Sequence, residues 1–203
     1  LGLSVQMFGT GAGGLHYAPA GLHVLGYMSG DSTDAVTDPV SAISELNSQH
    51  PYRKVGVGAV KQALNWYSGF SAEIGLPVTL FETNSMALTP AGLGLPVFGA
   101  TPHLATLEVC AGKTVTVVCF PGMRDFLVEL ICAALVKTGG SASVVEAPLP
   151  GKLTENAALA KSFDRLSDLS GYFAALKSEL SANTDVVLLP AVMGLRRSGE
   201  ILA

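Results

Sequence analysis

One stretch, residues 113–147, most constrains how this chain can fold. Residues 114–120 (TVTVVCF) form an apolar, β-branched run without polar alternation, as in a strand covered on both faces of a parallel sheet. After a Pro-Gly pair, residues 124–137 carry apolar side chains at helical spacing. A Gly-Gly pair ends this predicted helix, and residues 143–147 predict a second strand. The stretch therefore predicts a βαβ unit.

A third strand of the same kind is predicted at residues 185–189 (DVVLL). Between the second and third strands we expect two helices, which begin with caps at Thr154 and Asp168. Strands that alternate with helices in this way are typical of α/β proteins. The predicted fold class is therefore α/β, with a doubly wound, mostly parallel sheet.

The first half of the chain predicts helices followed by a small antiparallel patch. Apolar spacing indicates helices over residues 36–48 and 57–74. Trp66 lies beside the apolar stripe of the second helix, and we interpret it as a packing residue. Residues 78–82 and 86–89 are short strand-like runs, which we expect to pair as a hairpin around the Thr-Asn-Ser turn between them.

Composition excludes several classes of function. The net charge is −4 and only 14% of residues are charged, so no basic face is indicated and no nucleic-acid partner is expected. The three cysteines are odd in number and match no zinc or haem spacing. Buried thiols in a reducing cytoplasm are the favoured interpretation. The four histidines show no metal-ligand spacing, and no apolar run reaches the roughly 18–20 residues that span a bilayer.

A glycine-rich segment follows the predicted strand at residues 3–8. Gly9, Gly11 and Gly14 match the G-x-G-x-x-G spacing of a dinucleotide loop. That loop requires a helix directly after it, whereas a proline and a glycine interrupt the residues that follow. A glycine-rich turn that leaves a strand is therefore favoured, with a phosphate-binding loop as the alternative.

Residues 120–124, at the carboxyl end of the first strand of the βαβ unit, are a second candidate site. Ligands bind at this edge of doubly wound sheets, and Arg124 with free backbone N–H groups suits a phosphate. The alternative, that Asp125 caps the helix and Arg124 faces water, is favoured. His16 and His23 flank the glycine-rich segment and are candidates to line a pocket.

Five segments occur together, in an order that resembles one family. They are GLHYAPAGLHVLG at 14–26, HPYRKVG at 50–56, ALTPAG at 87–92, VTVVCFPGMRDF at 115–126 and VVLLPAVMGL at 186–195. In this order and at these intervals they resemble the B subunit of anaerobic glycerol-3-phosphate dehydrogenase. Each segment alone is unspecific, and the resemblance rests on their collinearity over almost the whole chain.

This resemblance implies a flavoprotein oxidoreductase of glycerol metabolism and anaerobic respiration. The family oxidises sn-glycerol 3-phosphate to dihydroxyacetone phosphate, and electrons pass to menaquinone. The implied partners are a companion flavin subunit and an iron–sulfur subunit at the membrane. The implied location is cytoplasmic, peripheral at the inner face of the cell membrane through the complex. The implied cofactor is FMN, or FAD, in the full-length protein, where the protein supplies position and electrostatics for the flavin.

The resemblance also implies that the chain is the middle of a longer subunit. It would lack the N-terminal flavin glycine loop and the C-terminal flavin segment, so we expect this piece alone to bind no flavin and to be inactive. Residues 1–34 would be a remnant of a Rossmann-like flavin-binding domain, and 35–203 an inserted α/β domain. Within the insert, the helical pair and antiparallel patch would occupy 35–112 and the βαβ layer 113–203.

By the same resemblance, Thr10, Gly11 and Gly21 fall near the flavin edge, and no catalytic residue can be assigned. The strand at 3–8 would be the second strand of the flavin domain, and it ends without a carboxylate for an adenosine ribose, which favours a mononucleotide flavin.

Two other functions stay open. One is a non-catalytic α/β interaction module that docks a partner subunit, favoured by the scarcity of convergent polar residues. The other is a stand-alone nucleotide-binding protein that uses Gly9, Gly11 and Gly14.

Overall fold

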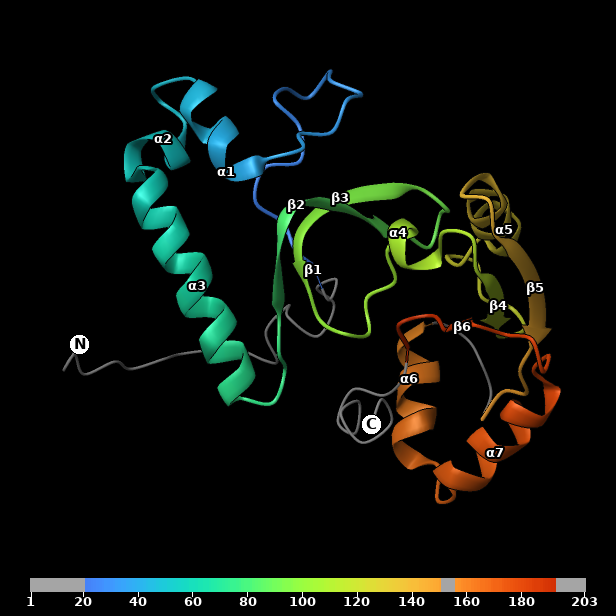
Figure 1. Ribbon diagram of the computed structural model, residues 1–203. Coiled ribbons are helices and arrows are strands. Elements are labelled where there is room, and N and C mark those ends of the chain that lie inside the picture. The colour runs from blue at the N-terminus through green and yellow to red at the C-terminus, as the bar shows by residue number, and fades with distance from the viewer. Residues whose placement is uncertain (1–20, 151–155, 193–203) are drawn as a thin grey trace.

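Two sheets organise the residues that the computed structural model describes, 21–150 and 156–192 (Figure 1). The elements are, in order, β1 (Gly21–Leu22), α1 (Pro39–Ala42), the 3-10 helix η2 (Ile43–Glu45), α2 (Pro51–Val55), α3 (Val57–Glu73), β2 (Thr79–Leu88), β3 (Gly94–Ala100), α4 (Leu107–Cys110), β4 (Thr114–Cys119), α5 (Val128–Lys137), β5 (Ser141–Glu146), α6 (Asn156–Arg165), α7 (Leu169–Glu179) and β6 (Val186–Leu188).

The second sheet is parallel and is covered by helices on both faces. Its strand order is β5-β4-β6, and β4 pairs in parallel with both neighbours. Val115 and Val117 of β4 pack with Ile131 and Leu135 of α5, whereas Val118 packs with Phe163 of α6. Figure 1 shows α5 on one side of this sheet and α6 with α7 on the other. The predicted α/β, doubly wound class is confirmed.

Helix α5 begins later than the sequence predicted, at Val128 instead of residue 124. Gly122 adopts a φ of 81°, so the chain turns after β4 before it can become helical. The N-cap is Leu127, without a side-chain hydrogen bond to the helix, and its N–H donates to the Pro90 carbonyl at 2.8 Å. The interpretation of Asp125 as the helix cap is therefore wrong.

The first sheet is antiparallel, with the order β1-β3-β2. The small antiparallel patch is confirmed, but the hairpin predicted around residues 83–85 is wrong, because those residues belong to the single strand β2. The hairpin turn lies instead at residues 89–93, where the Thr89 N–H donates to the Leu93 carbonyl at 2.8 Å. The register shifts between Leu80, which pairs with Gly99, and Ser85, which pairs with Val97.

Asn84, inside this irregular part of β2, holds the segment that precedes α1. Its side-chain amide donates to the carbonyl of Leu25 at 2.9 Å and to that of Val36 at 2.7 Å. Its backbone N–H donates to the Thr37 carbonyl at 2.8 Å. Three hydrogen bonds from one residue therefore join β2 to a segment about 50 residues earlier in the chain.

The hairpin turn at residues 89–93 contacts α5. Gly92 has a φ of 73°, and a Cβ built at this position would overlap the carbonyl oxygen of Leu130. Together with the hydrogen bond from Leu127 to Pro90, this close approach joins the antiparallel sheet to the helix of the βαβ unit. Only a residue without a side chain fits such an approach in this conformation.

The N-terminal helices cover part of the antiparallel sheet. Asp38 caps α1 through Val40 and Ser41, as its sequence position indicates. The predicted 36–48 helix is shorter in the structure, because α1 ends at Ala42, η2 continues only to Glu45, and residues 46–48 are not helical. Helix α3 agrees with the predicted 57–74. The apolar cluster that joins these elements to β3 is Val40, Ile43, Leu46, Val60, Leu64 and Phe98.

The outer face of α3 contradicts the packing role assigned to Trp66. Its side chain is 66% exposed and stacks on Phe70, with ring centroids 5.2 Å apart and an interplanar angle of 4°. Ile74 and Leu76 at the end of the helix are also more than half exposed. Helix α3 therefore buries one narrow side and presents apolar side chains on another.

Glu108 of α4 anchors β2, and we expect its ionisation to be visible in the stability of the fold. The carboxylate accepts hydrogen bonds from Ser85 Oγ at 2.5 Å and from the Met86 N–H at 3.1 Å. Partial burial raises the pKa of Glu108, but the hydrogen bonds lower it further, so the pKa lies below the ordinary value of 4.5. A depressed pKa stabilises the folded state above the pKa of the unfolded chain, and this contribution is lost as the pH falls through the folded pKa.

The measurement is the free energy of unfolding in urea at neutral pH and at about pH 3. The unaltered chain is expected to lose more stability on acidification than Glu108→Gln, and Ser85→Ala is expected to lie between them. Equal losses for all three proteins would show that this carboxylate does not contribute.

The cysteines agree with their interpretation as packed thiols. Cys110 is fully buried, and Cys119 and Cys132 are half-buried. Burial raises the pKa of all three thiols. Among the described residues, no helix is both long and apolar enough to cross a membrane.

Candidate functional site

The flavin edge predicted from the sequence is described by the structure only at Gly21. Thr10 and Gly11, together with Gly9, Gly14 and His16, lie outside the described residues. Gly21 is the first described residue of β1, which lies at one edge of the antiparallel sheet formed by the described strands, and it pairs with Ala100 of β3. Strands at a sheet edge present backbone groups on their outer side that can bind a polar partner.

Gly21 lies very close to its neighbours. A Cβ at this position would lie 2.7 Å from Cγ2 of Val97 and 3.0 Å from Cδ2 of Leu104. The absence of a side chain at Gly21 therefore allows β1 to approach β3 and the segment that follows it.

His23 is fixed to β3 in one orientation. Its Nδ1 lies 2.7 Å from the carbonyl oxygen of Pro96. Because a carbonyl oxygen only accepts, Nδ1 carries the hydrogen, and Nε2 of the neutral ring is an acceptor. The side chain is exposed, so His23 presents a polar edge near Gly21.

Thr101 contributes a buried hydroxyl beside the same strand pair. Thr101 directly follows Ala100, the partner of Gly21. Its Oγ1 is buried and has no hydrogen-bond partner, the sole case of this kind among the described side chains. Because a buried polar atom without a partner is unfavourable, this hydroxyl suits a polar group that the described residues do not supply.

The second sequence candidate, residues 120–124, is less well formed. Met123 packs into the apolar clusters on the two faces of the parallel sheet, and its N–H donates to the Phe120 carbonyl at 3.3 Å. Arg124 is exposed. The described hydrogen bond of His23 goes to Pro96 and not to this loop. The atoms nearest to a Cβ at Gly21 do not belong to this loop either.

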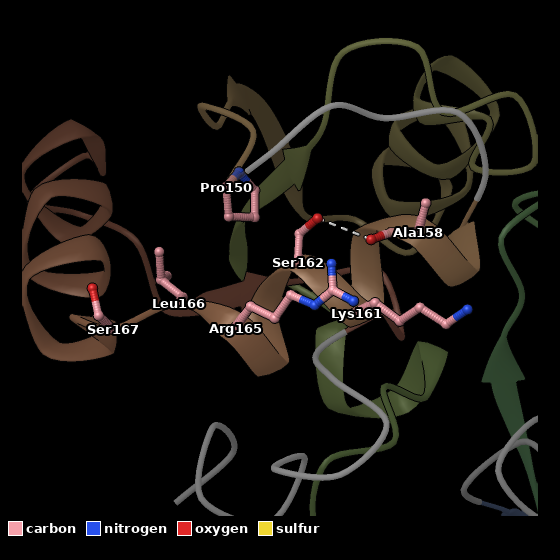
Figure 2. A pocket seen from close by; sticks show the side chains of 7 residues that line it. All are labelled: Pro150, Ala158, Lys161, Ser162, Arg165, Leu166 and Ser167. Atoms are coloured by element: carbon pink, nitrogen blue, oxygen red, sulfur yellow. Dashed lines mark hydrogen bonds between the residues drawn. The ribbon is translucent and has the colours of Figure 1, made fainter.

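Sequence reasoning missed a pocket on α6, shown in Figure 2, which we call the basic pocket. It has a volume of about 490 Å³ and is lined by Pro150, Lys161, Ser162, Arg165, Leu166 and Ser167. Lys161 and Arg165 are four residues apart on one helix and therefore share a face. This K-x-x-x-R spacing is visible in the sequence, but it is equally typical of a solvated helix face and does not by itself indicate a pocket.

A second cavity, of about 350 Å³, lies where the hairpin turn meets α5. Its lining is largely apolar and includes Leu93, Leu107, Leu130 and Ala134. Among the residues with described structure, no group of three or more His, Cys, Asp or Glu could hold a metal ion.

Comparison with known families identifies the class of protein. The family model of the FAD binding domain matches residues 3–203. The chain belongs to this FAD-binding family. Its members bind flavin, so the flavoprotein class implied by the sequence resemblance is confirmed, and the α/β architecture agrees with it.

Curated relatives of this chain carry the name of the B subunit of anaerobic glycerol-3-phosphate dehydrogenase, which confirms the resemblance. The protein from Aliivibrio fischeri (strain ATCC 700601 / ES114) is 28% identical over 136 residues, which cover 64% of this chain and 30% of the relative. That from Yersinia enterocolitica is 28% identical over 96% of this chain and 49% of the relative. That from Vibrio vulnificus is 26% identical over 95% of this chain and 48% of the relative.

The chain thus spans about half, or less, of the length of the curated relatives it matches. No solved structure is significantly similar to it.

Proposed function

We propose that this chain is part of a flavin-dependent sn-glycerol-3-phosphate dehydrogenase. The proposed reaction converts glycerol 3-phosphate to dihydroxyacetone phosphate, and the electrons pass through an iron–sulfur subunit to menaquinone. The observation that carries the proposal is the match of the FAD-binding family to residues 3–203, together with the shared name of the relatives. That name describes one subunit of several, which supports a complex with partner subunits. We propose that these include a companion flavin subunit and that the complex lies at the inner face of the cell membrane.

The proposed place of the flavin is the edge of the antiparallel sheet at Gly21, with Thr10 and Gly11 contributing from the preceding segment. Two observations support it. β1 is an edge strand in the described sheet, and the buried Thr101 hydroxyl beside it has no hydrogen-bond partner in the described structure. These residues fit the polar side of a flavin ring, which would supply the redox chemistry when bound. We propose FMN over FAD, and we propose that residues 1–34 belong to the flavin domain and 35–203 to an inserted domain.

The test uses the complete natural polypeptide that carries this sequence, expressed with its companion subunits. We expect flavin to co-purify, to be identified as FMN by mass after denaturation, and to be reduced by sn-glycerol 3-phosphate without oxygen. Thr101→Val is expected to weaken flavin retention, because it removes the hydroxyl while keeping the shape. A flavin-free complex, or a flavin that glycerol 3-phosphate does not reduce, would contradict the proposal.

A second candidate function is the non-catalytic interaction module, which the exposed apolar side of α3 favours. Trp66 and Phe70 form a stacked pair there, and aromatic side chains are enriched at protein interfaces. Co-purification of the companion flavin subunit with the unaltered chain, but not with Trp66→Ala/Phe70→Ala, would support it. Equal co-purification of both would argue against it.

A further inference from the structure

The residues that line the basic pocket on α6 have no role in the proposed flavin chemistry. Its volume of about 490 Å³ falls within the range of small-molecule sites, roughly 300–1,000 Å³. Pro150, in the loop after the carboxyl end of β5, forms one wall, and α6 with the residues after it forms the other. Loops at the carboxyl edge of parallel strands are where doubly wound sheets bind ligands.

Two cations define the polar side of the pocket. Figure 2 shows the side chains of Lys161 and Arg165 extending in the same direction along α6, away from Leu166. Both side chains are exposed. Like charges four residues apart on a helix repel each other, so an anion between them would relieve this repulsion. The chain as a whole is acidic, with a net charge of −4.

The remaining lining residues limit the kind of anion. The Ser162 hydroxyl donates to the Ala158 carbonyl at 2.9 Å, so its hydrogen is already used within the helix. Pro150 and Leu166 supply apolar surface. A guanidinium group can bind two oxygens of a phosphate at once, and an ammonium group adds a second charge. The lining therefore offers two positive donors on one side and an apolar wall on the other.

We propose that the basic pocket binds a phosphate monoester. Arg165 and Lys161 hold the phosphate group, and the organic part of the ligand lies against Pro150 and Leu166. The site is separate from the proposed flavin edge at Gly21, and it needs no flavin and no companion subunit. Its ligand binding is tested in the complete natural polypeptide that carries this sequence, and its failure would leave the proposed dehydrogenase function untouched.

The experiment is calorimetric titration of this polypeptide with inorganic phosphate and with phenyl phosphate, with ionic strength held constant by potassium chloride. We expect saturable binding of both, tighter for phenyl phosphate because its ring contacts the apolar wall. Arg165→Gln and Lys161→Gln are each expected to weaken binding about tenfold, the size of one lost charge-assisted hydrogen bond. Arg165→Lys keeps the positive charge but loses the planar guanidinium group that can bind two oxygens at once. Its effect on binding should therefore be smaller than that of Arg165→Gln.

The matched control is Lys177→Gln, which removes one exposed positive charge from α7, outside the pocket. It should bind both phosphates as the unaltered chain does. Far-ultraviolet circular dichroism and the melting temperature report whether each variant is folded. The proposal is overturned if neither phosphate binds saturably, or if Lys161→Gln/Arg165→Gln, folded by these measures, binds as the unaltered chain does. It is equally overturned if Lys177→Gln weakens binding as much as the pocket variants, because the effect is then one of net charge.

Discussion

Phe163→Ala is expected to destabilise the protein by about 3–5 kcal/mol, the usual loss when a buried aromatic side chain is truncated. Phe163 of α6 is fully buried in the cluster between the parallel sheet and helices α6 and α7. Its ring makes edge contacts with Phe120, at a centroid distance of 5.7 Å, and with Tyr172, at 5.5 Å. The substitution removes the ring from the centre of this cluster and leaves a cavity that the surrounding aromatic side chains cannot fill.

The free energy of unfolding in urea measures this loss. Phe70→Ala is the matched control, because it makes the same chemical change on α3, where the side chain is 39% exposed. We expect the control to cost less than about 1 kcal/mol, as for most surface substitutions. Similar losses for the two variants would mean that α6 is not packed on the sheet as described.

Gly92→Ala is the second large effect that we expect, at about 2–5 kcal/mol. A side chain in the left-handed region costs about 1–2 kcal/mol, and overpacking of a filled contact adds about 1–3 kcal/mol. The added Cβ would overlap the backbone of α5 at the Leu130 carbonyl. A backbone atom cannot rotate aside as a side chain does, so the hairpin turn must move away from the helix.

Gly112→Ala separates the two contributions. Gly112 also has a positive φ, of 67°, but a Cβ there would meet nothing within 4 Å. Urea unfolding of this control should show only the conformational cost of about 1–2 kcal/mol. If both substitutions cost the same, the contact between the hairpin turn and α5 is absent in solution.

The parallel layer could be predicted from the sequence because local pattern and tertiary environment agree there. The predicted strand at 114–120 corresponds to β4 (Thr114–Cys119), and its apolar run is buried because helices cover both faces of the sheet. Asp168 caps α7 as predicted, and its carboxylate accepts the Gly171 N–H at 2.7 Å. In these cases the residues adjacent in sequence determine the structure.

The errors have long-range causes. The start of α5 depends on a hydrogen bond between Leu127 and Pro90, residues 37 positions apart. The continuity of β2 through Asn84 depends on carbonyl groups of Leu25 and Val36. The exposure of Trp66 depends on how little of α3 the sheet covers. No local pattern carries this information.

The candidate sites likewise combine residues that the sequence could indicate with contacts that depend on distant parts of the chain. The glycine at position 21 could be singled out from the resemblance, but its close approach to Val97 requires the pairing of β1 with β3. The basic pocket was missed because Lys161 and Arg165 look like ordinary solvated charges on a helix. Their face becomes one side of a pocket only because Pro150, in the segment after β5, lies close to it.

The irregular register of β2 has a consequence for how the length of this chain can vary. Leu80 pairs with Gly99 and Ser85 with Val97, so residues 81–84 of β2 lie opposite Phe98 alone. Extra residues on one strand are accommodated locally, without sliding the paired stretches past each other. An insertion or deletion before Asn84 would therefore change the size of this bulge and leave both ladders aligned. Related chains can differ in length here, in the interior of a sheet, where a regular strand would not tolerate it.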